Sequence, residues 1–563
     1  MNANAIQAGL FVIVIGLLVK PVGAYLERVF ERRRTFLDPI LLPVERLIHG
    51  FVGIDCQRDM DWRRYSLAFG IFGVVNILLI YFTLRWQALF PWFFPRVMTT
   101  PMTPDLAANT AVSFATTTTW QAYAGETTMS YFSQLLLAGQ NFLAGAAGLA
   151  VGVAFIRGYA RERSKGLGNF WSDLTRAVLW VLLPISLIGS LFLIAQGVPM
   201  NFRPYTVVHT LEGATQMIAQ GPVAALEFIK NLGTNGGSFF NANGAHPFEN
   251  PTPLTNFVEL LAIVVIPAAL THTFGRMVGR PRDGWVIFWT MTALFITALL
   301  VCGWAESSMR PSFGPAIAGG NMEGKEVRFG TSGSALAAVV TSNGATGSYN
   351  SMHDSFQPLG VMVPLLNMLL GEIVYGGLGT GLYGMIFVAL IALFVGGLMI
   401  GRRPEHLGKQ IGPPEMKIIA VYTLVAPVVV LALTALAVVT KPGLAGLTTN
   451  SGPHGFTEIL FAYASAFANN GQSMAGLSAN NVFYNTTTII AMLAGRYILA
   501  VLALSLAGRF AAMPRRPPSP GTMPSDGFVF GVLLAGTALL LGALNFLPAL
   551  ALGPIVEHFS THS

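Results

Sequence analysis

Long apolar runs separated by short polar segments make up most of this chain. They cover residues 4–24, 66–86, 131–155, 174–196, 257–278, 284–304, 361–400, 416–440, 487–508 and 527–551. Most are about 20 residues long, the length that an α-helix needs to cross the hydrocarbon core of a bilayer. The pattern predicts an all-α polytopic membrane protein with about ten transmembrane helices. No Lys or Arg precedes the first run, so we interpret it as an anchor rather than a cleavable leader.

The composition agrees with this pattern. Of 563 residues, 53% are apolar and only 10% are charged, and the mean hydropathy is +0.59. A soluble surface needs about 25% charged residues, so a soluble enzyme and a disordered chain are both excluded. The two cysteines, Cys56 and Cys302, are too few for a disulfide scaffold or a thiolate metal cluster.

The basic residues are concentrated between the apolar runs. The net charge is +7, and 23 of the 33 Lys and Arg fall within 25–65, 156–177, 276–282, 402–417 and 509–516. The positive-inside rule places these segments in the cytoplasm. The charge therefore indicates topology rather than a nucleic-acid partner, and both termini are predicted to lie outside.

Four outer segments remain, at 88–130, 197–256, 305–360 and 441–486. Each contains an apolar stretch too short to span a bilayer, beginning at Asp105, Pro222, Ser332 and Thr457, and each begins with a residue that favours a helix start. Each stretch runs into a polar tract, with centres near residues 118, 235, 346 and 470. The near-constant spacing of 117, 111 and 124 residues indicates an internal repeat.

These tracts suggest an ion site. Irregular backbone is tolerated at membrane depth only where it is buried in protein or lines a water-filled cavity. Four tracts that meet on one axis would form a ring of oxygens able to replace the hydration shell of a cation. None of the tracts contains an acidic residue, which favours a monovalent ion over Ca²⁺ or Mg²⁺. The alternative is four ordinary glycine-rich loops.

The strings TWQAYAGETTMSYFSQ, LGTNGGSFFNANGAHPFENPTPLTNF, NMEGKEVRFG, MHDSFQPLG, GEIVYGGLGTGLYGM and NNGQSMAGLSAN resemble the potassium-binding A subunit (KdpA) of bacterial potassium-transporting P-type ATPases. The resemblance covers nearly the whole chain. It implies four span–pore-helix–filter–span repeats in pseudo-fourfold arrangement, plus one extra helix at each end. The corresponding units are 1–60 (N-terminal helix and basic loop), 61–165, 166–282, 283–412 and 413–516 (repeats 1 to 4), and 517–563 (C-terminal helix).

The resemblance also implies the function. The chain would take K⁺ from the outer side and pass it through an intramembrane tunnel to the B subunit of the complex, which hydrolyses ATP. The C subunit, a small single-span subunit and the lipid bilayer would be the other partners, in the inner membrane of a bacterium. K⁺ would be the transported ion, with no metal cofactor, no nucleotide and no nucleic acid on this chain.

By the same resemblance, the potassium filter comprises Thr117, Thr118, Thr234, Asn235, Gly236, Ala345, Thr346, Gly347, Asn469, Asn470 and Gly471. Gln121 would tune ion discrimination beside the first filter strand. Thr117 and Thr346 stand where one known member of the family has Asn and Cys. Backbone carbonyl ligands tolerate such changes.

The 361–400 run carries five glycines within residues 376–384, which should unwind its helix midway. A dinucleotide fingerprint needs a soluble strand–helix unit and is excluded here. In the related family, a broken helix in the third repeat gates the pore, which would involve Gly377, Gly379 and Gly381. The alternative is a kink that serves only packing.

Two charged residues and one histidine lie well inside apolar runs, away from the ends of the runs. Arg496 should face protein or water, since a charge at mid-bilayer costs about 2.5–3.5 kcal/mol. It would form a barrier below the filter or, alternatively, pair with an acid. Glu372 would line the tunnel or pair locally, and His272 is expected to be a satisfied buried or boundary residue.

Enzyme motifs are absent from the sequence. No phosphate-binding loop and no Asp-Lys-Thr-Gly tract occur, so the chain is not predicted to hydrolyse ATP by itself. The hypotheses are a translocating subunit of an ATP-driven pump, a self-sufficient potassium channel or symporter, and a membrane scaffold or redox subunit. The long motifs favour the first.

Overall fold

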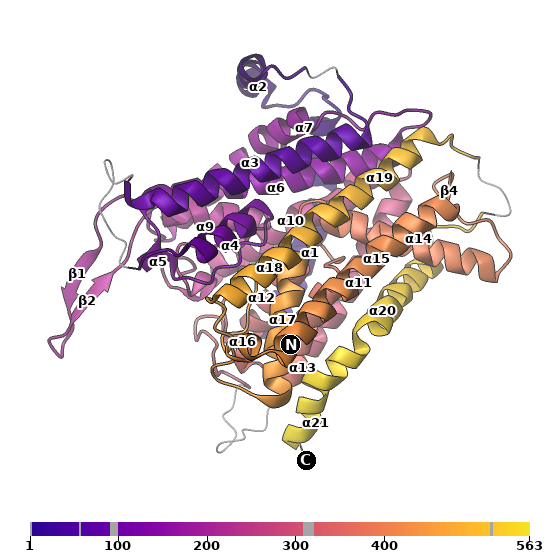
Figure 1. The fold of residues 1–563 in the computed structure, drawn as a ribbon. Coiled ribbons are helices and arrows are strands. Elements are labelled where there is room, and N and C mark those ends of the chain that lie inside the picture. Colours follow the sequence, from indigo (N-terminus) through magenta and orange to yellow (C-terminus); the bar gives the residue numbers. More distant parts are fainter. Residues whose placement is uncertain (1–2, 56–57, 90–99, 308–319, 518–521, 563) are drawn as a thin grey trace.

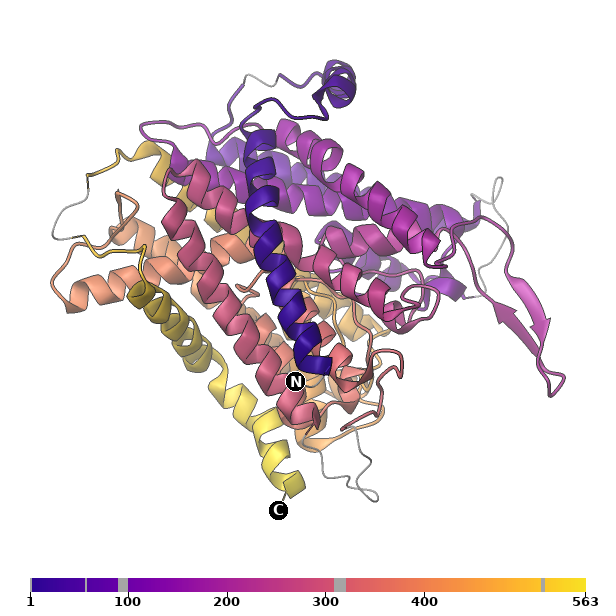
Figure 2. The ribbon, with the colours of Figure 1, turned by 180° about the vertical axis from the view of Figure 1, so that it is seen from behind.

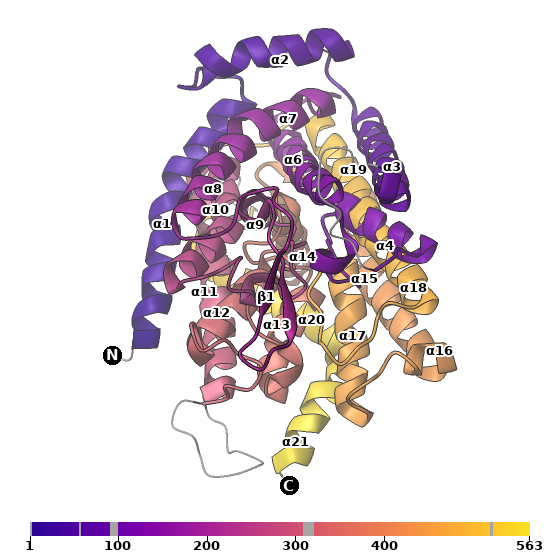
Figure 3. The same ribbon diagram turned by 90° about the vertical axis from the view of Figure 1, so that its left-hand side faces the viewer.

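We describe a computed structural model of the chain, covering residues 3–55, 58–89, 100–307, 320–517 and 522–562. Cys56 lies outside the described residues. Within them, ten helices are long and apolar enough to cross a membrane, and they match the ten predicted spans, with the seventh shortened to its second part. The termini lie at one end of the molecule, and the helix α2 (Asp38–Val52) lies at the other (Figure 3).

After the N-terminal helix, the chain passes four times through a long helix, a short helix, a polar tract and a further helix, and these four units are called repeats 1 to 4. Figure 1 labels their helices, and Figure 2 shows the N-terminal helix at the front of the bundle. The N-terminal helix is α1 (Ala3–Phe30). Repeat 1 contains α3 (Trp62–Trp86), η1 (Gln87–Leu89), α4 (Pro104–Ala115), α5 (Gly125–Thr128) and α6 (Tyr131–Ala160). Repeat 2 contains α7 (Phe170–Arg176), η2 (Ala177–Leu182), α8 (Leu183–Ala195), β1 (Thr206–His209), β2 (Thr215–Ile218), α9 (Val223–Leu232), η3 (Asn243–Ala245) and α10 (Pro253–Met277).

The second half of the chain repeats this order. Repeat 3 contains α11 (Pro281–Ser307), α12 (Gly330–Asn343), η4 (His353–Ser355), α13 (Pro358–Leu369), α14 (Thr380–Met399), β3 (Glu405–His406) and β4 (Lys409–Gln410). Repeat 4 contains α15 (Pro413–Val439), α16 (Lys441–Leu444), α17 (Gly452–Ala468), α18 (Val482–Leu493), η5 (Ala494–Ile498) and α19 (Leu499–Ala512). The chain ends with α20 (Phe528–Leu550), η6 (Ala551–Ile555) and α21 (Val556–His562).

The four predicted short helices are α4, α9, α12 and α17, and each packs against helices that precede and follow it in its own repeat. α4 contacts α3 and α6, α9 contacts α8 and α10, α12 contacts α11 and α13, and α17 contacts α15 and α18. They are nearly all buried and mostly apolar, whereas the outer helices expose apolar side chains as a lipid-facing surface does. The sequence did not predict α2 or the antiparallel hairpin β1–β2, which projects from one side (Figure 1).

The predicted break in the third repeat is present, but it is displaced. The chain leaves the helix after α13 at Leu369 and becomes helical again at Thr380. Gly379 adopts a φ of +103°, which only glycine tolerates easily, and it immediately precedes α14. Gly381 lies inside α14, so the glycines beyond Gly379 do not unwind the helix as expected.

Candidate functional site

The four polar tracts share one backbone conformation. Thr117, Thr234, Ala345 and Asn469 adopt φ angles of 65°, 50°, 50° and 58°. Each lies one or two residues beyond its short helix, and the spacing between them is that predicted for the repeat. A left-handed conformation is uncommon for residues other than glycine and is strained. Its occurrence at the same place in all four repeats indicates a site built for a common purpose.

The same four residues surround one small cavity. It has a volume of about 20 Å³ and is lined by Thr117, Thr234, Ala345 and Asn469 together with residues of α6, the break in repeat 3, and Arg496. Four segments far apart in the sequence therefore converge, as the fourfold hypothesis requires. Ordinary surface loops would be exposed, but these residues are buried.

Neighbouring tracts also contact one another directly. The Gly347 N–H donates to the Asn235 carbonyl at 3.2 Å, and the Thr119 hydroxyl donates to the same carbonyl at 2.5 Å. The Asn469 side-chain amide donates to the Thr118 hydroxyl at 2.9 Å. A Cβ on Gly347 would lie 2.9 Å from the Asn470 carbonyl oxygen, tighter than ordinary contact. These contacts join the four tracts into one ring.

A wide vestibule lies on the other side of the ring. It has a volume of about 700 Å³ and is lined by residues that follow each tract, namely 120–124, 241–242, 245, 349, 351–353, 473–475 and 477–480, together with 324–326. Gln121 lines this vestibule. Its side chain donates to the Ser238 carbonyl at 2.9 Å and accepts from the Ser238 N–H at 2.8 Å. Gln121 therefore lies against the second tract as well as the first.

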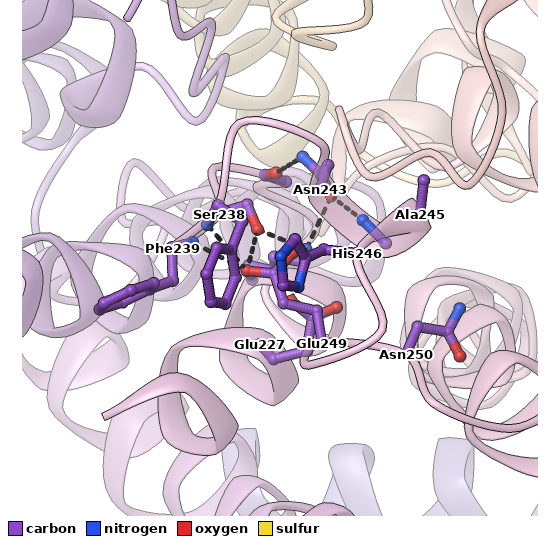
Figure 4. Close-up of polar contacts among 12 residues, drawn as sticks. Glu227, Ser238, Phe239, Asn243, Ala245, His246, Glu249 and Asn250 are labelled. Carbon is purple, nitrogen blue, oxygen red and sulfur yellow. Dashed lines mark hydrogen bonds and ion pairs between the residues drawn. The ribbon is translucent and has the colours of Figure 1, made fainter. Parts of the chain in front are cut away.

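A buried polar network lies behind the second tract. Figure 4 shows Glu227, Ser238, Asn243 and Glu249 grouped around the loop that follows α9. The ammonium of Lys230 bonds the Asn243 side-chain oxygen at 2.7 Å, and Asn243 donates to the Gly236 carbonyl at 2.9 Å. The sequence reasoning did not identify these residues. The available signal was a Lys and a Glu within a short apolar helix.

Glu372 lies at the break in the third repeat and contacts a residue of the fourth repeat. The Asn470 side-chain amide donates to the Glu372 carboxylate at 2.7 Å, so this acid contacts the fourth tract from below. Glu372 also lines a second cavity of about 40 Å³, which shares Thr380, Ala468 and Asn469 with the cavity beneath the ring. Gly377 lines the first cavity.

Arg496 points into the cavity beneath the ring from η5, a π-helical stretch in an otherwise α-helical span. Such stretches are frequent at functional sites. Its guanidinium donates to the Ala144 carbonyl at 2.9 Å and lies 5.7 Å from the ring centre of Phe69. Among the described residues it forms no ion pair with an acid.

His272 differs from its expectation in one respect. It is buried in α10 and packs edge-on against Trp285, as expected of a buried residue. Neither ring nitrogen has a hydrogen-bond partner within the described part of the chain, however, so the histidine is not satisfied there. Gly23 of α1 approaches α10 closely at this point, since a Cβ on Gly23 would lie 2.9 Å from the His272 Cβ.

Comparison with known proteins decides the family. The sequence model of the KdpA family, described as the potassium-transporting ATPase A subunit, matches residues 9–559. The chain belongs to the KdpA family. It is 52% identical to the potassium-transporting ATPase potassium-binding subunit of a strain of Methylorubrum extorquens, over 98% of this chain and 97% of that protein. It is also 52% identical to the subunit of the same name from Granulibacter bethesdensis, over 99% of this chain and 98% of that protein.

A solved structure supports the fold of this KdpA chain. The potassium transporter TrkH from Vibrio parahaemolyticus superposes with a TM-score of 0.52, covering 91% of this chain and 100% of that one, at 14% sequence identity. At such low identity the likeness shows the fold alone. The predicted all-α membrane fold is thereby confirmed, and KdpA membership makes the chain a subunit of a potassium-transporting ATPase.

Proposed function

We propose that this chain selects K⁺ at the ring of four tracts, accepting it from the outer vestibule. The observation that carries this proposal is the convergence of four left-handed residues, Thr117, Thr234, Ala345 and Asn469, around one cavity. The ring residues offer neutral backbone and side-chain oxygens, which suit a monovalent cation. The short helices end at the ring, so the negative ends of their dipoles face a bound cation.

We further propose that the ion leaves the ring sideways. The cavity beneath the ring borders the Glu372 cavity, and this borders a third cavity of about 90 Å³ between α14, α15 and α20. Leu369, Gly371 and Tyr422 belong to both of the last two cavities. This series supports a tunnel that carries K⁺ toward the ATP-hydrolysing subunit of the complex. The Glu372 carboxylate would attract a cation along it.

We propose that Arg496 and the break in repeat 3 control the passage of K⁺ below the ring. A guanidinium without an acidic partner among the described residues raises the electrostatic energy of a cation directly below the ring. It would thus oppose straight passage across the membrane and favour the lateral route. Gly377 and Gly379 would let the break in repeat 3 form the lower wall of the same cavity.

The test uses the purified complex with Gly471→Ala. Gly471 has a φ of +95°, and an added Cβ would collide with the Thr118 carbonyl oxygen. We expect the K⁺ concentration for half-maximal ATPase activity to rise about tenfold or more, because a ligand of the ring is displaced. Gly536→Ala is the matched control, since nothing lies within 4 Å of its Cβ position. An unchanged K⁺ requirement in Gly471→Ala would overturn the filter assignment.

The channel or symporter hypothesis is tested separately. Here the chain is purified without its partners, placed in liposomes and assayed for passive K⁺ flux. We expect flux close to that of empty liposomes, because the pump hypothesis needs ATP hydrolysis by another subunit. Robust flux from the chain alone would instead support a self-sufficient channel.

A further inference from the structure

A fully buried lysine stands behind the second tract. The Lys230 side chain is 0% exposed, and its ammonium lies 2.5 Å from a Glu227 carboxylate oxygen. Removing a charge from water is costly unless it is paired and hydrogen-bonded, and an apolar residue at such a site is often equally stable. A buried charge with no advantage in stability is explained if it positions other groups. The remaining contacts of Lys230 show which groups these are.

One set of contacts leads from Lys230 to the Gly236 carbonyl. The ammonium donates to the Asn243 side-chain oxygen at 2.7 Å. An ammonium has only donors, so Asn243 must turn its oxygen toward Lys230 and its NH₂ away. That NH₂ donates to the Gly236 carbonyl at 2.9 Å. Lys230 and the Gly244 N–H, which donates to the same oxygen at 2.9 Å, therefore hold the Asn243 amide in this direction. Through Asn243 they hold the peptide that follows Gly236.

The backbone of Lys230 fixes the same tract at its other side. The Lys230 carbonyl accepts from the Asn235 N–H at 2.8 Å. The Asn235 carbonyl is in turn the acceptor for Gly347 and Thr119 of the adjoining tracts. One residue thus holds the second tract at Asn235 through its backbone and at Gly236 through its side chain.

A second set of contacts passes through Glu249, which lies in the loop before α10. One carboxylate oxygen accepts from the N–H groups of Phe239 and Phe240 at 3.0 and 3.1 Å and from the Ser238 hydroxyl (Figure 4). The other lies 3.7 Å from the Lys230 ammonium. The Lys230 ammonium also bonds the Ser238 hydroxyl at 3.2 Å. Lys230 and Glu249 therefore hold Ser238 from both sides.

Ser238 carries this constraint to the first repeat. Its backbone N–H and carbonyl both bond the Gln121 side chain, at 2.8 and 2.9 Å. The position of Gln121 at the mouth of the ring thus depends on where Glu249 and Lys230 place the Ser238 backbone. Neither charged group lines the vestibule or the cavity beneath the ring, so neither is a candidate ion ligand.

We propose that Lys230 and Glu249 are positioning residues that set the K⁺ affinity of the ring by fixing the Gly236 carbonyl, through Asn243, and the Gln121 side chain, through Ser238. This rests on the proposed function of the ring as a K⁺ filter. The pair acts on geometry at a distance from the ion. Loss of either residue should therefore change the K⁺ affinity and the ion selectivity of the site more than it changes the rate of ATP hydrolysis at saturating K⁺.

The experiment uses the intact purified complex and measures K⁺-stimulated and Rb⁺-stimulated ATPase activity. The variants are Lys230→Met, Asn243→Asp, the double variant and Glu249→Gln. Asn243→Asp keeps the oxygen that faces Lys230 but loses the NH₂ that holds the Gly236 carbonyl. We expect each single variant to raise the half-saturating K⁺ concentration about tenfold and to narrow the preference for K⁺ over Rb⁺, with the maximal rate changed less than about twofold.

The double variant separates positioning from general destabilisation. If Lys230 acts through Asn243, Lys230→Met with Asn243→Asp should cost no more affinity than the larger single effect, since coupled residues are not additive. Additive losses, or a lower melting temperature with unchanged K⁺ affinity, would overturn the proposal. Lys409→Met is the control. Lys409 is equally buried, but its ammonium bonds the carbonyls of Arg161 and Met513, remote from the ring, so its half-saturating K⁺ concentration should not shift.

The same measurements distinguish the positioning role of Lys230 and Glu249 from the assignment of the ring as a K⁺ filter. If Gly471→Ala raises the K⁺ requirement while Lys230→Met and Glu249→Gln do not, the ring binds K⁺ but the pair does not position it. If none of these variants alters the K⁺ requirement, the filter assignment fails first.

Discussion

The backbone N–H of Gly347 donates to the backbone carbonyl of Asn235 at 3.2 Å, joining the third tract to the second. The two residues belong to different repeats, 112 positions apart in the sequence. The contact is possible because Gly236, the next residue, has no side chain, and a Cβ there would collide with the Gly347 backbone. Glycine in this tract therefore serves close approach between repeats as well as its own φ of +106°.

The first prediction follows from this contact. Gly236→Asp should force the second and third tracts apart and place a carboxylate beside the ring. We expect the K⁺ concentration needed for transport to rise about a hundredfold, with weaker discrimination against other monovalent ions. Gln121→Glu should act in the same direction but less, since its carboxylate can still accept from the Ser238 N–H but cannot donate to its carbonyl. Growth of cells at limiting K⁺ and ion-stimulated ATPase activity measure both effects.

The control is Gly9→Ser in α1, because nothing lies within 4 Å of the Cβ position there. Normal growth of the Gly236→Asp strain at limiting K⁺ would contradict the prediction.

The second prediction concerns leakage past Arg496. Replacing it with Gln removes the charge beneath the ring but keeps a donor for the Ala144 carbonyl. We expect passive K⁺ flux through the reconstituted complex, without ATP, to increase about tenfold, because an electrostatic barrier to the cation is lost. Liposomes containing a K⁺-sensitive dye report this flux.

Arg509→Gln serves as the comparison, since Arg509 pairs with Glu415 and its side chain is 42% exposed. Equal leakage from the two variants, or none from Arg496→Gln, would argue against a barrier at Arg496.

The third prediction concerns Gly379 at the start of α14. A Cβ at this position would lie 2.8 Å from the Gly148 carbonyl and 2.8 Å from the Gly152 Cα, and its φ is +103°. Gly379→Ala should therefore push the break in repeat 3 away from α6 and lower the maximal transport rate about tenfold. Gly396→Ala, later in α14, meets nothing closer than 3.5 Å and should be neutral. If the kink serves only packing, Gly379→Ala should lower the stability of the complex, but the transport rate per folded complex should stay unchanged.

The fourth prediction is a pH dependence of stability at His454. This histidine, in the first turn of α17, bonds Asp354 at 3.0 Å and Glu557 at 2.7 Å, which ties the end of the chain to the loop after the third tract. Burial lowers the pKa of His454, but the hydrogen bonds to Asp354 and Glu557 outweigh this and raise it to about 10. Because the folded pKa exceeds the unfolded value of about 6.5, the stabilising effect is complete below that pH and is lost as the pH rises through about 10.

Melting temperatures of the wild type and His454→Gln, measured from about pH 6 to 10.5, check this. The wild type should melt at a higher temperature than the variant at the acidic end of this range, and the difference should shrink as the pH rises. A difference that stays constant over the whole range would show that the proton on His454 contributes nothing.

The amino-acid sequence by itself determined the ten spans, the four short helices and the places where they end. These features depend on local properties, namely the length of an apolar run, a residue that starts a helix and a polar tract that follows it. The separation of the four left-handed residues, from Thr117 to Asn469, matches the predicted repeat for this reason. The break near residue 380 was also expected, although its limits were not, because glycine alone does not decide where a packed helix ends.

Only the tertiary structure decided how the tracts are held. The bond between Asn470 and Glu372, the approach of Arg496 to the Ala144 carbonyl and the path from Lys230 to the Gly236 carbonyl depend on side-chain direction, and the first two join different repeats. Such contacts leave no local pattern, since a residue type does not reveal which distant carbonyl it will meet. Buried charges show this contrast between local pattern and tertiary contact. The free energy of burying a charge in a membrane protein depends on partners that only the folded chain brings together.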